Sequence, residues 1–322
     1  MAAGAAIAAA LLLRPDRPIG RLRRRYGTAT SRFVRLRNGV VVHVRDEGPR
    51  DGPAIVLCHG MLGDVAMWDA WARALRPRYR VIRFDWPGHG LTWAPPSYRH
   101  TVQGGCALLR ELLHLWDVEA PIIGGQSLGA DIAWRYALAE PERVAGLILV
   151  NASGWPDSRL GYKAAAMAWR ALKSRRLRRL LGALEPGPFV YLTSWMTFFP
   201  SRPPTSVVHR YRDLLLHPLH RCALGELLSG WDERPPATRA SLRTLRAPVL
   251  VLHGAADLAV PAAHARAFAS AIDGAELHVL AGAGHLLPMT HPAKTVALVE
   301  RWLDRLDFRP GSTQELEHRP VE

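Results

Sequence analysis

The sequence predicts an α/β protein in which a mostly parallel, eight-stranded sheet is covered by helices on both faces and carries an α-helical insertion. Two patterns indicate this architecture. Short apolar runs alternate with stretches of helical periodicity over 32–155 and again over 247–308. Residues 156–246 contain no run typical of a buried strand, but several helical stretches. With 322 residues, 48% apolar and 22% charged, the chain is long enough for one large globular domain with an insertion.

The chain is expected to enter the sheet through a hairpin. Two runs rich in β-branched residues, 32–37 and 40–46, flank Asn38-Gly39, and Asn-Gly in that position is a strong hairpin signal. Apolar runs predict the remaining strands, at 54–58, 80–84, 120–123, 146–150, 249–252 and 276–280. Helical periodicity predicts the helices that connect them, at 65–75, 101–116, 128–138, 262–271 and 292–307.

The segments outside this alternation have their own composition. The insertion, 156–246, shows helical stretches at 160–184 and 206–216 that are separated by prolines, among them Pro186 and Pro188. Residues 1–31 form an N-terminal extension, with a small-apolar run followed by arginines, and 309–322 form a polar C-terminal tail; poor order is an expectation for both. As a helix, the apolar run would span about 18 Å, short of the ~30 Å hydrocarbon core of a bilayer. It also lacks the positive n-region of a secretory signal.

Charge and cysteine content limit the function classes. The net charge of +14 is uneven, because 1–50 and 156–246 carry eight and ten more basic than acidic residues, whereas the rest carries four more acidic than basic ones. No nucleic-acid-binding module is recognisable around the basic parts, so no nucleic-acid partner is expected. The three cysteines have no paired spacing, which favours neither a disulfide framework nor a zinc site and indicates a reducing, cytoplasmic compartment.

The run Gly125-Gln126-Ser127-Leu128-Gly129 lies between a predicted strand and a predicted helix. Gly-x-Ser-x-Gly in that context is typical of a nucleophile elbow, a strained turn that presents a serine hydroxyl at the carboxyl end of a strand. The residues two before and two after the serine must be small, because a Cβ there would collide with the turn. The alternative is an ordinary glycine-rich turn with an incidental serine.

A serine nucleophile needs a base, and the base needs a carboxylate that fixes its tautomer. In this architecture the three are expected in the order Ser, acid, His, each on a loop after a strand. Asp257 and His285 follow the last two predicted strands and fit that order. A helix cap and a plain loop histidine are the alternatives, and Asp157, after the strand 146–150, is a weaker candidate for the acid.

Acyl transfer also needs donors for an oxyanion. The backbone N–H of Leu128, next to the nucleophile, is one expected donor. The other is expected from the loop after strand 54–58, where Met61 follows His59-Gly60. His217 and His220 lack the carboxylate spacing of a metal site, and neither a metal nor a cofactor is expected.

With these motifs the chain resembles an α/β-hydrolase fold protein with a helical cap, of the esterase, cofactor-free haloperoxidase and meta-cleavage-product hydrolase group. The resemblance covers 32–308. It rests on the run around Ser127 and on four further motifs, His59-Gly60, Asp85-x-x-Gly88-x-Gly90, His253-Gly254-x-x-Asp257-x-x-Val260-Pro261 and Gly284-His285. It implies a serine hydrolase whose cap is 156–246. Haloalkane dehalogenases and epoxide hydrolases have aspartate in place of Ser127, which argues against those activities.

The leading hypothesis is a serine hydrolase that cleaves an ester or related acyl bond through an acyl-enzyme. A C–C hydrolase or a perhydrolase would use the same triad, and hydrolase folds also serve as non-catalytic binding proteins. The insertion is expected to roof the site, since it follows a strand at the catalytic edge of the sheet. Aromatic candidates for the pocket walls suggest a small apolar substrate, although each suits a core position equally well: Trp86, Trp155, Trp195, Phe198 and Phe199. The oligomeric state stays open.

A peripheral role at the inner face of a membrane is a further hypothesis. Arginines beside the apolar N-terminal run favour the cytoplasmic side. The segment 159–179 adds eight Arg or Lys residues in an expected helix that also carries Leu160, Met167, Leu172, Leu177 and Leu180. That mixture suits a helix lying on anionic lipid. It equally suits a cap helix whose leucines face the active site and whose arginines face water.

Overall fold

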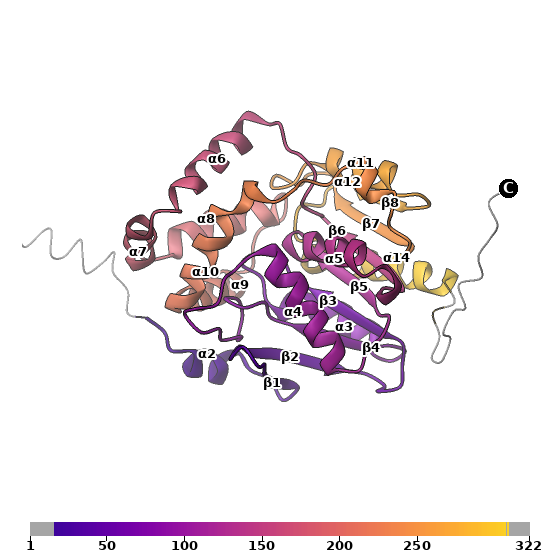
Figure 1. Ribbon diagram of the computed structural model, residues 1–322, viewed down its shortest axis with the longest axis horizontal. Helices are drawn as coiled ribbons and strands as arrows, with labels where there is room; N and C mark the ends of the chain where they lie inside the picture. The colour runs from indigo at the N-terminus through magenta and orange to yellow at the C-terminus, as the bar shows by residue number, and fades with distance from the viewer. Residues whose placement is uncertain (1–15, 307, 309–322) are drawn as a thin grey trace, which may run out of the picture.

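The computed structural model describes residues 16–306 and residue 308, so the predicted apolar run at the N-terminus and the C-terminal tail lie outside the described residues. An eight-stranded sheet forms the centre of the molecule (Figure 1), in the order β1-β2-β4-β3-β5-β6-β7-β8. The pairs β1–β2 and β2–β4 are antiparallel and the other five are parallel, which confirms the predicted fold class. The strands are β1 (Ser31–Arg35), β2 (Val41–Glu47), β3 (Ala54–Cys58), β4 (Arg80–Phe84), β5 (Ile122–Gln126), β6 (Gly146–Val150), β7 (Val249–Gly254) and β8 (Glu276–Leu280).

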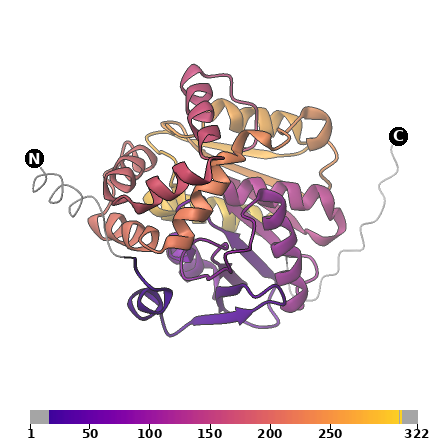
Figure 2. The same cartoon turned by 60° about the vertical axis from the view of Figure 1, so that its left-hand side comes forward.

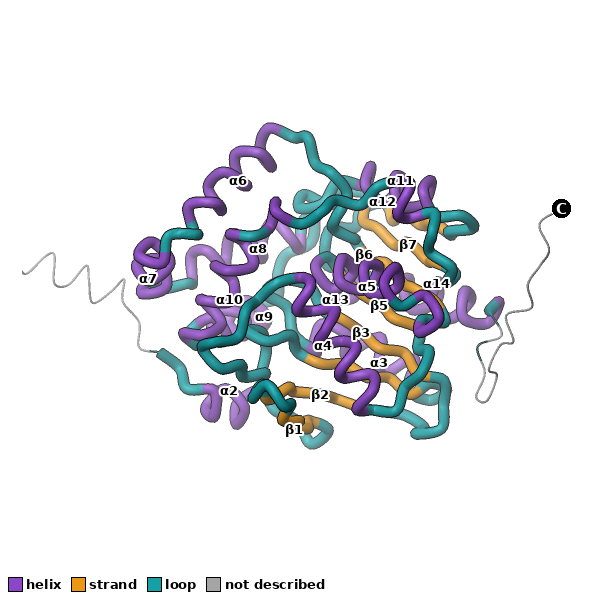
Figure 3. Tube along the Cα trace, viewed as in Figure 1, coloured by secondary structure: helices purple, strands orange, loops and turns teal. Residues whose placement is uncertain are grey.

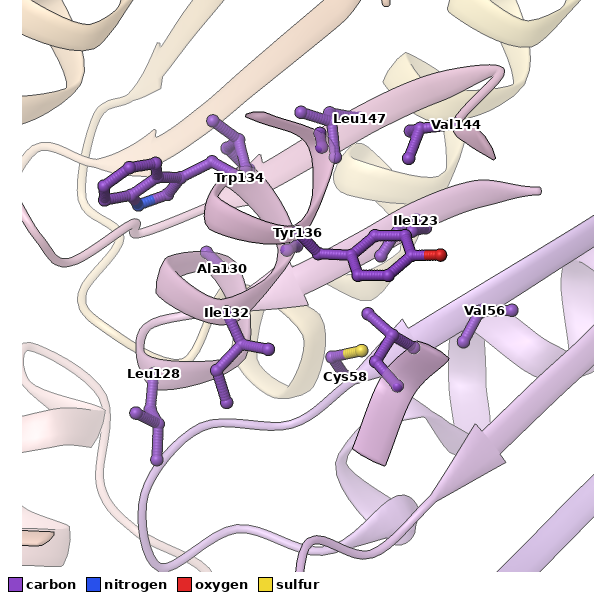
Figure 4. Close-up of a cluster of buried hydrophobic side chains, with 14 of the residues drawn as sticks. Val56, Cys58, Ile123, Leu128, Ala130, Ile132, Trp134, Tyr136, Val144 and Leu147 are labelled. Atoms are coloured by element: carbon purple, nitrogen blue, oxygen red, sulfur yellow. The ribbon is translucent and has the colours of Figure 1, made fainter. Parts of the chain in front are cut away.

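Helices cover both faces of this sheet (Figure 3). On one face lie α4 (Val102–Leu115), α5 (Leu128–Ala139) and α12 (Ala262–Ala271), and on the other lie α3 (Asp69–Leu75) and α14 (Pro292–Arg305). Alternate residues of one strand therefore enter different cores: Val56 and Cys58 pack toward α5, Ile55 and Leu57 toward α3. Figure 4 shows the first of these cores, around the side chains of α5. Because both faces are buried, the central strands β3 and β6 are continuous apolar runs rather than alternating ones.

The predicted hairpin joins β1 and β2, but its loop is longer than the Asn-Gly pair alone. Leu36 N–H donates to Val40 O at 2.8 Å, which leaves a three-residue loop, and Gly39 N–H donates to Leu36 O at 3.0 Å. Gly39 has φ +85°, as the last residue of such a loop requires. The asparagine contributes through its side chain, since Asn38 Oδ1 accepts the N–H of Val40 at 3.1 Å.

The chain between β6 and β7 is helical, as expected, but its helices are arranged differently. The stretch 160–184 is two helices, α6 (Leu160–Ala171) and α7 (Arg175–Ala183), because Ser174 interrupts the first and caps the second. Pro188 and Pro218 stand in the first turns of α8 (Gly187–Phe198) and α10 (Pro218–Ser229), where a missing N–H costs nothing. The insertion also holds α9 (Thr205–Leu215), η3 (Trp231–Glu233) and α11 (Arg239–Leu242).

Several ion pairs join this insertion to the rest of the molecule, and two of them bind buried carboxylates outside it. Arg210 of α9 binds Asp64, with 2.5 Å between Nε and Oδ2, and Arg234 binds Asp131 of α5. Both carboxylates are almost completely buried. Since an unpaired buried charge is costly, these contacts hold the insertion in place over the sheet.

The described part of the N-terminal extension is folded, contrary to the expectation of poor order. It contains α2 (Ile19–Tyr26), whose Leu22 is fully buried against Leu91 and Leu214 of α9. Arg17 N–H donates to Leu216 O at 2.9 Å. Turning the molecule brings α2 forward beside the insertion (Figure 2). None of the described helices is both long and apolar enough to cross a bilayer.

Three further short elements complete the described chain. The helix expected at 65–75 is a 3-10 turn, η1 (Val65–Trp68), followed by α3. The others are η2 (Pro141–Arg143) and α13 (Leu287–Thr290). Strand β5 runs to Gln126, beyond the expected end at 123, because Gly124 and Gly125 continue the strand although their type does not signal one.

Candidate active site

Strand β5 turns directly into α5, and Ser127 occupies the turn. Its φ of +52° and ψ of −110° lie in a region that residues with a Cβ rarely adopt. Its backbone is held on both sides: Ser127 N–H donates to Val150 O at 3.0 Å, and the Ser153 hydroxyl donates to Ser127 O at 3.1 Å. Strain of this kind costs about 1–3 kcal/mol and persists only where the surroundings enforce it.

The two glycines of the motif allow the turn to pack. A Cβ on Gly125 would lie 2.4 Å from the backbone of Gly129, and a Cβ on Gly129 would lie 2.2 Å from the carbonyl oxygen of Cys58 at the end of β3. Contacts with backbone atoms at that distance cannot be relieved by a side-chain rotation. Small residues at both positions are therefore a steric requirement of the turn.

Asp257 follows β7, His285 follows β8, and the structure brings them together. His285 Nδ1 and Asp257 Oδ2 are 2.7 Å apart, and both residues are buried. The other carboxylate oxygen accepts the N–H groups of Ala259 and Val260 at 2.8 and 2.9 Å. Burial alone would raise the pKa of Asp257, but the charge and hydrogen bond of His285 lower it below its usual value. An ionised Asp257 can only accept, so Nδ1 carries the proton and Nε2 of His285 is left as the base.

Asp157, the weaker candidate for the acid, is engaged elsewhere. Its carboxylate binds the guanidinium of Arg159, with 2.7 Å between Oδ2 and Nη2. A second histidine is close to Asp257 instead: Nε2 of His253 lies 3.4 Å from Oδ2 of Asp257 and 3.0 Å from Val260 O. Burial lowers the pKa of His253. His253, within β7, is therefore a neutral neighbour of the Asp257 carboxylate.

Two residues at the site were missed by sequence reasoning. Asn151, at the end of β6, donates from Nδ2 to Asp257 Oδ2 at 2.7 Å and has a φ of +46°. Gln126 donates from Nε2 to His285 O at 2.9 Å, which fixes the histidine loop beside the residue that precedes Ser127. A signal existed for Asn151, because it is the first polar residue after an apolar strand and asparagine tolerates positive φ. No hydrogen bond joins the Ser127 hydroxyl to His285 among the described residues, and such bonds are often long before substrate binds.

The loop after β3 packs against the elbow. A Cβ on Gly60 would lie 2.1 Å from Oε1 of Gln126, so the loop approaches β5 closely. Within the described part of the chain, neither Met61 N–H nor Leu128 N–H donates to a backbone carbonyl. Both expected oxyanion donors thus lie on segments that meet beside Ser127.

Trp86 braces that loop. Its backbone N–H donates to His59 Nε2 at 3.1 Å and its indole N–H to His59 O at 2.9 Å. Asp85, just before it, accepts the N–H groups of Val65 and Leu91, each at 2.7 Å. Because Trp86 is only 3% exposed, its contacts are those of a structural brace.

The other aromatic candidates lie at different depths. Phe198 is buried in the core beside α3 and α14, and the ring of Trp155 packs against Phe268 of α12, with 5.7 Å between centroids. Trp195 is 47% exposed, and its ring lies 5.9 Å from that of the half-buried Phe199. The packing of Phe198, like that of Trp86, fits a residue of the protein core better than a wall of the substrate pocket.

The C-terminal end of α8 touches the histidine loop. His285 N–H donates to Thr197 O at 3.1 Å, and a Cβ on Gly284 would lie 1.7 Å from Phe199 O. The insertion therefore lies directly on the loop that carries His285. Among the described residues, no cluster of acidic, histidine or cysteine side chains has the arrangement of a metal site.

Comparison with known proteins agrees with this architecture. Residues 53–292 match the family model described as the alpha/beta hydrolase fold. An uncharacterized protein of Mycobacterium tuberculosis is 30% identical over 265 residues, which cover 79% of this chain and 76% of that protein. A protein of Variovorax paradoxus named as a carbamate hydrolase is 28% identical over 78% of this chain and 92% of its own length. The structure of a thermophilic esterase from Thermogutta terrifontis has a TM-score of 0.70 and 27% identity, covering 86% of this chain and 99% of the esterase.

Proposed function

The chain belongs to the α/β-hydrolase family and is a hydrolase, and from that premise we propose that it cleaves an ester or related acyl bond of a small, apolar substrate through an acyl-enzyme on Ser127. The observation that carries the proposal is the buried pair of His285 and Asp257, 2.7 Å apart, on loops next to a serine held in a strained turn. An ordinary glycine-rich turn needs neither the strain nor the pair.

In the proposed reaction, the hydroxyl oxygen of Ser127 attacks the acyl carbon while His285 Nε2 takes the hydroxyl proton. Asp257 stabilises the imidazolium that forms. The N–H groups of Leu128 and Met61 donate to the oxyanion, a contribution worth about 3–4 kcal/mol per donor. The imidazolium then protonates the leaving group, and a water activated by the same nitrogen hydrolyses the acyl-enzyme.

The proposal is tested by labelling Ser127 with a fluorophosphonate and by assaying a series of p-nitrophenyl esters of increasing acyl length. We expect stoichiometric labelling and turnover, both lost in Ser127→Ala, with turnover falling by about 10⁴-fold or more. Circular dichroism and thermal unfolding of the variant show whether the fold is intact. Absence of labelling would show that Ser127 is not the nucleophile. Labelling without turnover of any ester would change the proposed substrate class from an ester to another acyl compound or a C–C substrate of the same triad.

We further propose that the enzyme associates with the cytoplasmic face of an anionic membrane. The excess of basic residues in 156–246 supports this, although the segment 159–179 is two helices rather than one. The interpretation in which its apolar residues face the active site does not fit Leu160, Met167 and Leu180, which are 84, 70 and 63% exposed. Sedimentation with vesicles should depend on anionic lipid and weaken with salt. Binding that ignores both, or none by the full chain, contradicts the proposal.

A further inference from the structure

Helix α8 exposes an apolar face. One side of it packs inward through Val190, Ser194 and Phe198, while outward side chains that include Phe189, Leu192, Trp195 and Met196 are 36 to 57% exposed. The helix carries no Asp, Glu, Lys or Arg at all. The solvent face of a surface helix is normally polar, and a contiguous exposed apolar patch marks an interaction site.

Exposed apolar side chains are concentrated in this part of the molecule. Of the 13 large hydrophobic side chains that are exposed among the described residues, ten lie between Leu160 and Met196, on α6, α7, α8 and the turn before α8. In Figure 1, α6 and α7 stand at the opposite side of the molecule from α14. A scatter of single exposed residues needs no explanation, but a concentration of this size does.

The charge of this region favours an anionic partner for the exposed apolar surface. The sequence 159–196 contains eight basic residues and one acidic residue, Glu185, which is paired with Arg212. On α7, Arg175 and Arg176 are exposed next to the exposed side chains of Leu180 and Leu181. A second copy of this chain would place like charges against each other, whereas anionic lipid headgroups complement them.

We propose that the exposed face of α8, with the adjacent basic surface of α7, docks on an anionic phospholipid bilayer. Phe189, Leu192 and Met196 enter the boundary between headgroups and acyl chains, and Arg175 and Arg176 bind the headgroups. Apolar burial and charge together supply the two signals that stable peripheral binding requires.

The same helix leads to the candidate active site. Its last turn provides Thr197 O, which accepts His285 N–H at 3.1 Å, and Phe199, which follows it, packs on Gly284. A bilayer docked on α8 would therefore contact the helix whose last turn binds the His285 loop, and the rings of Trp195 and Phe199 lie 5.9 Å apart at that end of the helix. This deepens, and rests on, the proposed esterase function: the substrate class is an acyl ester dissolved in the bilayer, which reaches Ser127 along α8.

The docking surface is tested with the full chain by co-sedimentation with vesicles of phosphatidylcholine alone and of phosphatidylcholine with phosphatidylglycerol. We expect binding to the mixed vesicles, weakened about tenfold or more in the double variant Phe189→Ser, Leu192→Ser. Leu115→Ser, at a 53% exposed leucine of α4, is the matched apolar control and should bind as the parent does.

The charge contribution has its own pair of variants. Arg175→Gln with Arg176→Gln should weaken binding roughly fivefold for each residue removed. Arg301→Gln, at an exposed arginine of α14, is the control and should leave binding unchanged. If both α8 residues can be replaced without loss of vesicle binding, the proposed surface is wrong. A parent that is dimeric in sedimentation velocity, and an α8 variant that is monomeric, would assign the surface to a second copy and overturn the lipid proposal.

Activity separates this proposal from the one on which it rests. The α8 double variant should hydrolyse a short, water-soluble p-nitrophenyl ester at the parental rate, yet lose about tenfold on a long-chain ester embedded in the mixed vesicles. Equal loss on both substrates contradicts the docking role. A parent that binds vesicles but hydrolyses neither ester leaves the surface standing and removes the esterase function.

Discussion

The carboxyl edge of the sheet and the helical insertion differ in how their side chains are packed. At the edge, the candidate catalytic groups are held in place: the Asp257 carboxylate accepts four hydrogen bonds, from His285, Asn151 and two backbone N–H groups. In the insertion, α6, α7 and α8 leave large apolar side chains in solvent. The first region fixes its polar groups in position, and the second exposes the apolar surface that we propose docks on a bilayer.

This difference predicts where substitutions affect function most strongly. Catalysis depends on groups that stay within hydrogen-bond distance and in the correct protonation state, so the edge tolerates few changes. The proposed binding of the insertion to a bilayer would depend on the amount of apolar area and charge, so single substitutions there are expected to have graded effects. Matched substitutions in the two regions measure the contrast directly.

The largest contrast is expected between two aspartates. Asp257→Asn removes the carboxylate that fixes the His285 tautomer, and kcat should fall by about 10⁴-fold. Asp157→Asn, on the segment that leads into the insertion, weakens an ion pair with Arg159 but removes none of the hydrogen bonds to Asp257, so it should leave kcat within about twofold. Steady-state kinetics on a p-nitrophenyl ester measures both. Near-normal turnover in Asp257→Asn would assign the acid elsewhere.

A second contrast compares two glycines. Gly129→Ala places a Cβ 2.2 Å from Cys58 O, so the elbow must shift, at a cost of about 3 kcal/mol or more in the free energy of unfolding. Gly161→Ala, in α6, meets nothing within 4 Å and should stabilise by about 0.5–1 kcal/mol through helix propensity. Urea denaturation measures both changes. If Gly129→Ala unfolds like the parent and still reacts with a fluorophosphonate, the steric account of the elbow is wrong.

The same contrast explains what could be predicted from the sequence. Buried parallel strands are mostly apolar runs, so β3, β4 and β6 coincide with their predicted ranges. The edge strand β8 also coincides with its predicted range, although it is only half-buried. The elbow is a local motif whose glycines are required sterically, and the chain order of the acid and the base followed from it. That these residues act as the triad is the proposal that the Ser127 and Asp257 variants test.

The insertion was harder to predict because its periodicity is ambiguous. Residues 160–184 read as one amphipathic helix, yet Ser174 caps a new helix in their midst. Pro186 and Pro188 suggested a break, although a proline in the first turn begins a helix as readily as it ends one. Apolar residues in such a segment predict burial, and the exposure of Leu192 and Met196 depends on how the helices dock, which no local pattern contains.

Long-range contacts account for what was missed at the edge. Gln126 occupies an x position of the Gly-x-Ser-x-Gly motif, which specifies no residue type. Its role is a hydrogen bond to the backbone of His285, 159 positions away. Asn151 likewise donates a hydrogen bond to Asp257, 106 positions away. Segment 16–31 shows a similar limit, because the arginine-rich α2 is ordered by Leu22, its one buried side chain, which packs against distant residues. Composition describes such segments, but only the tertiary structure identifies their partners.

The smallest expected effect tests Asn151, at the point where the chain leaves the core for the insertion. Asn151→Gly removes the amide that donates to Asp257 at 2.7 Å and to Gly284 O at 3.3 Å, while glycine keeps the φ of +46° at no steric cost. Asn151 is a positioning residue, so we expect kcat/KM to fall about tenfold, the value of one hydrogen bond to a charged group. Asn151→Ala loses the same amide and adds about 1 kcal/mol of backbone strain, so the difference between the variants isolates the strain.

The dependence on pH distinguishes this role from a merely structural one. Because the fold lowers the pKa of Asp257, the bonds to its carboxylate stabilise the protein above the usual carboxyl pKa, and that contribution is lost as the pH falls through the lowered value. An amide donor to the charged form belongs to this contribution. The destabilisation by Asn151→Gly should therefore be full at neutral pH and should shrink on acidification, as measured by urea denaturation across the acid range. A difference that does not change with pH would mean that the amide supports the loop at Gly284 and not the carboxylate.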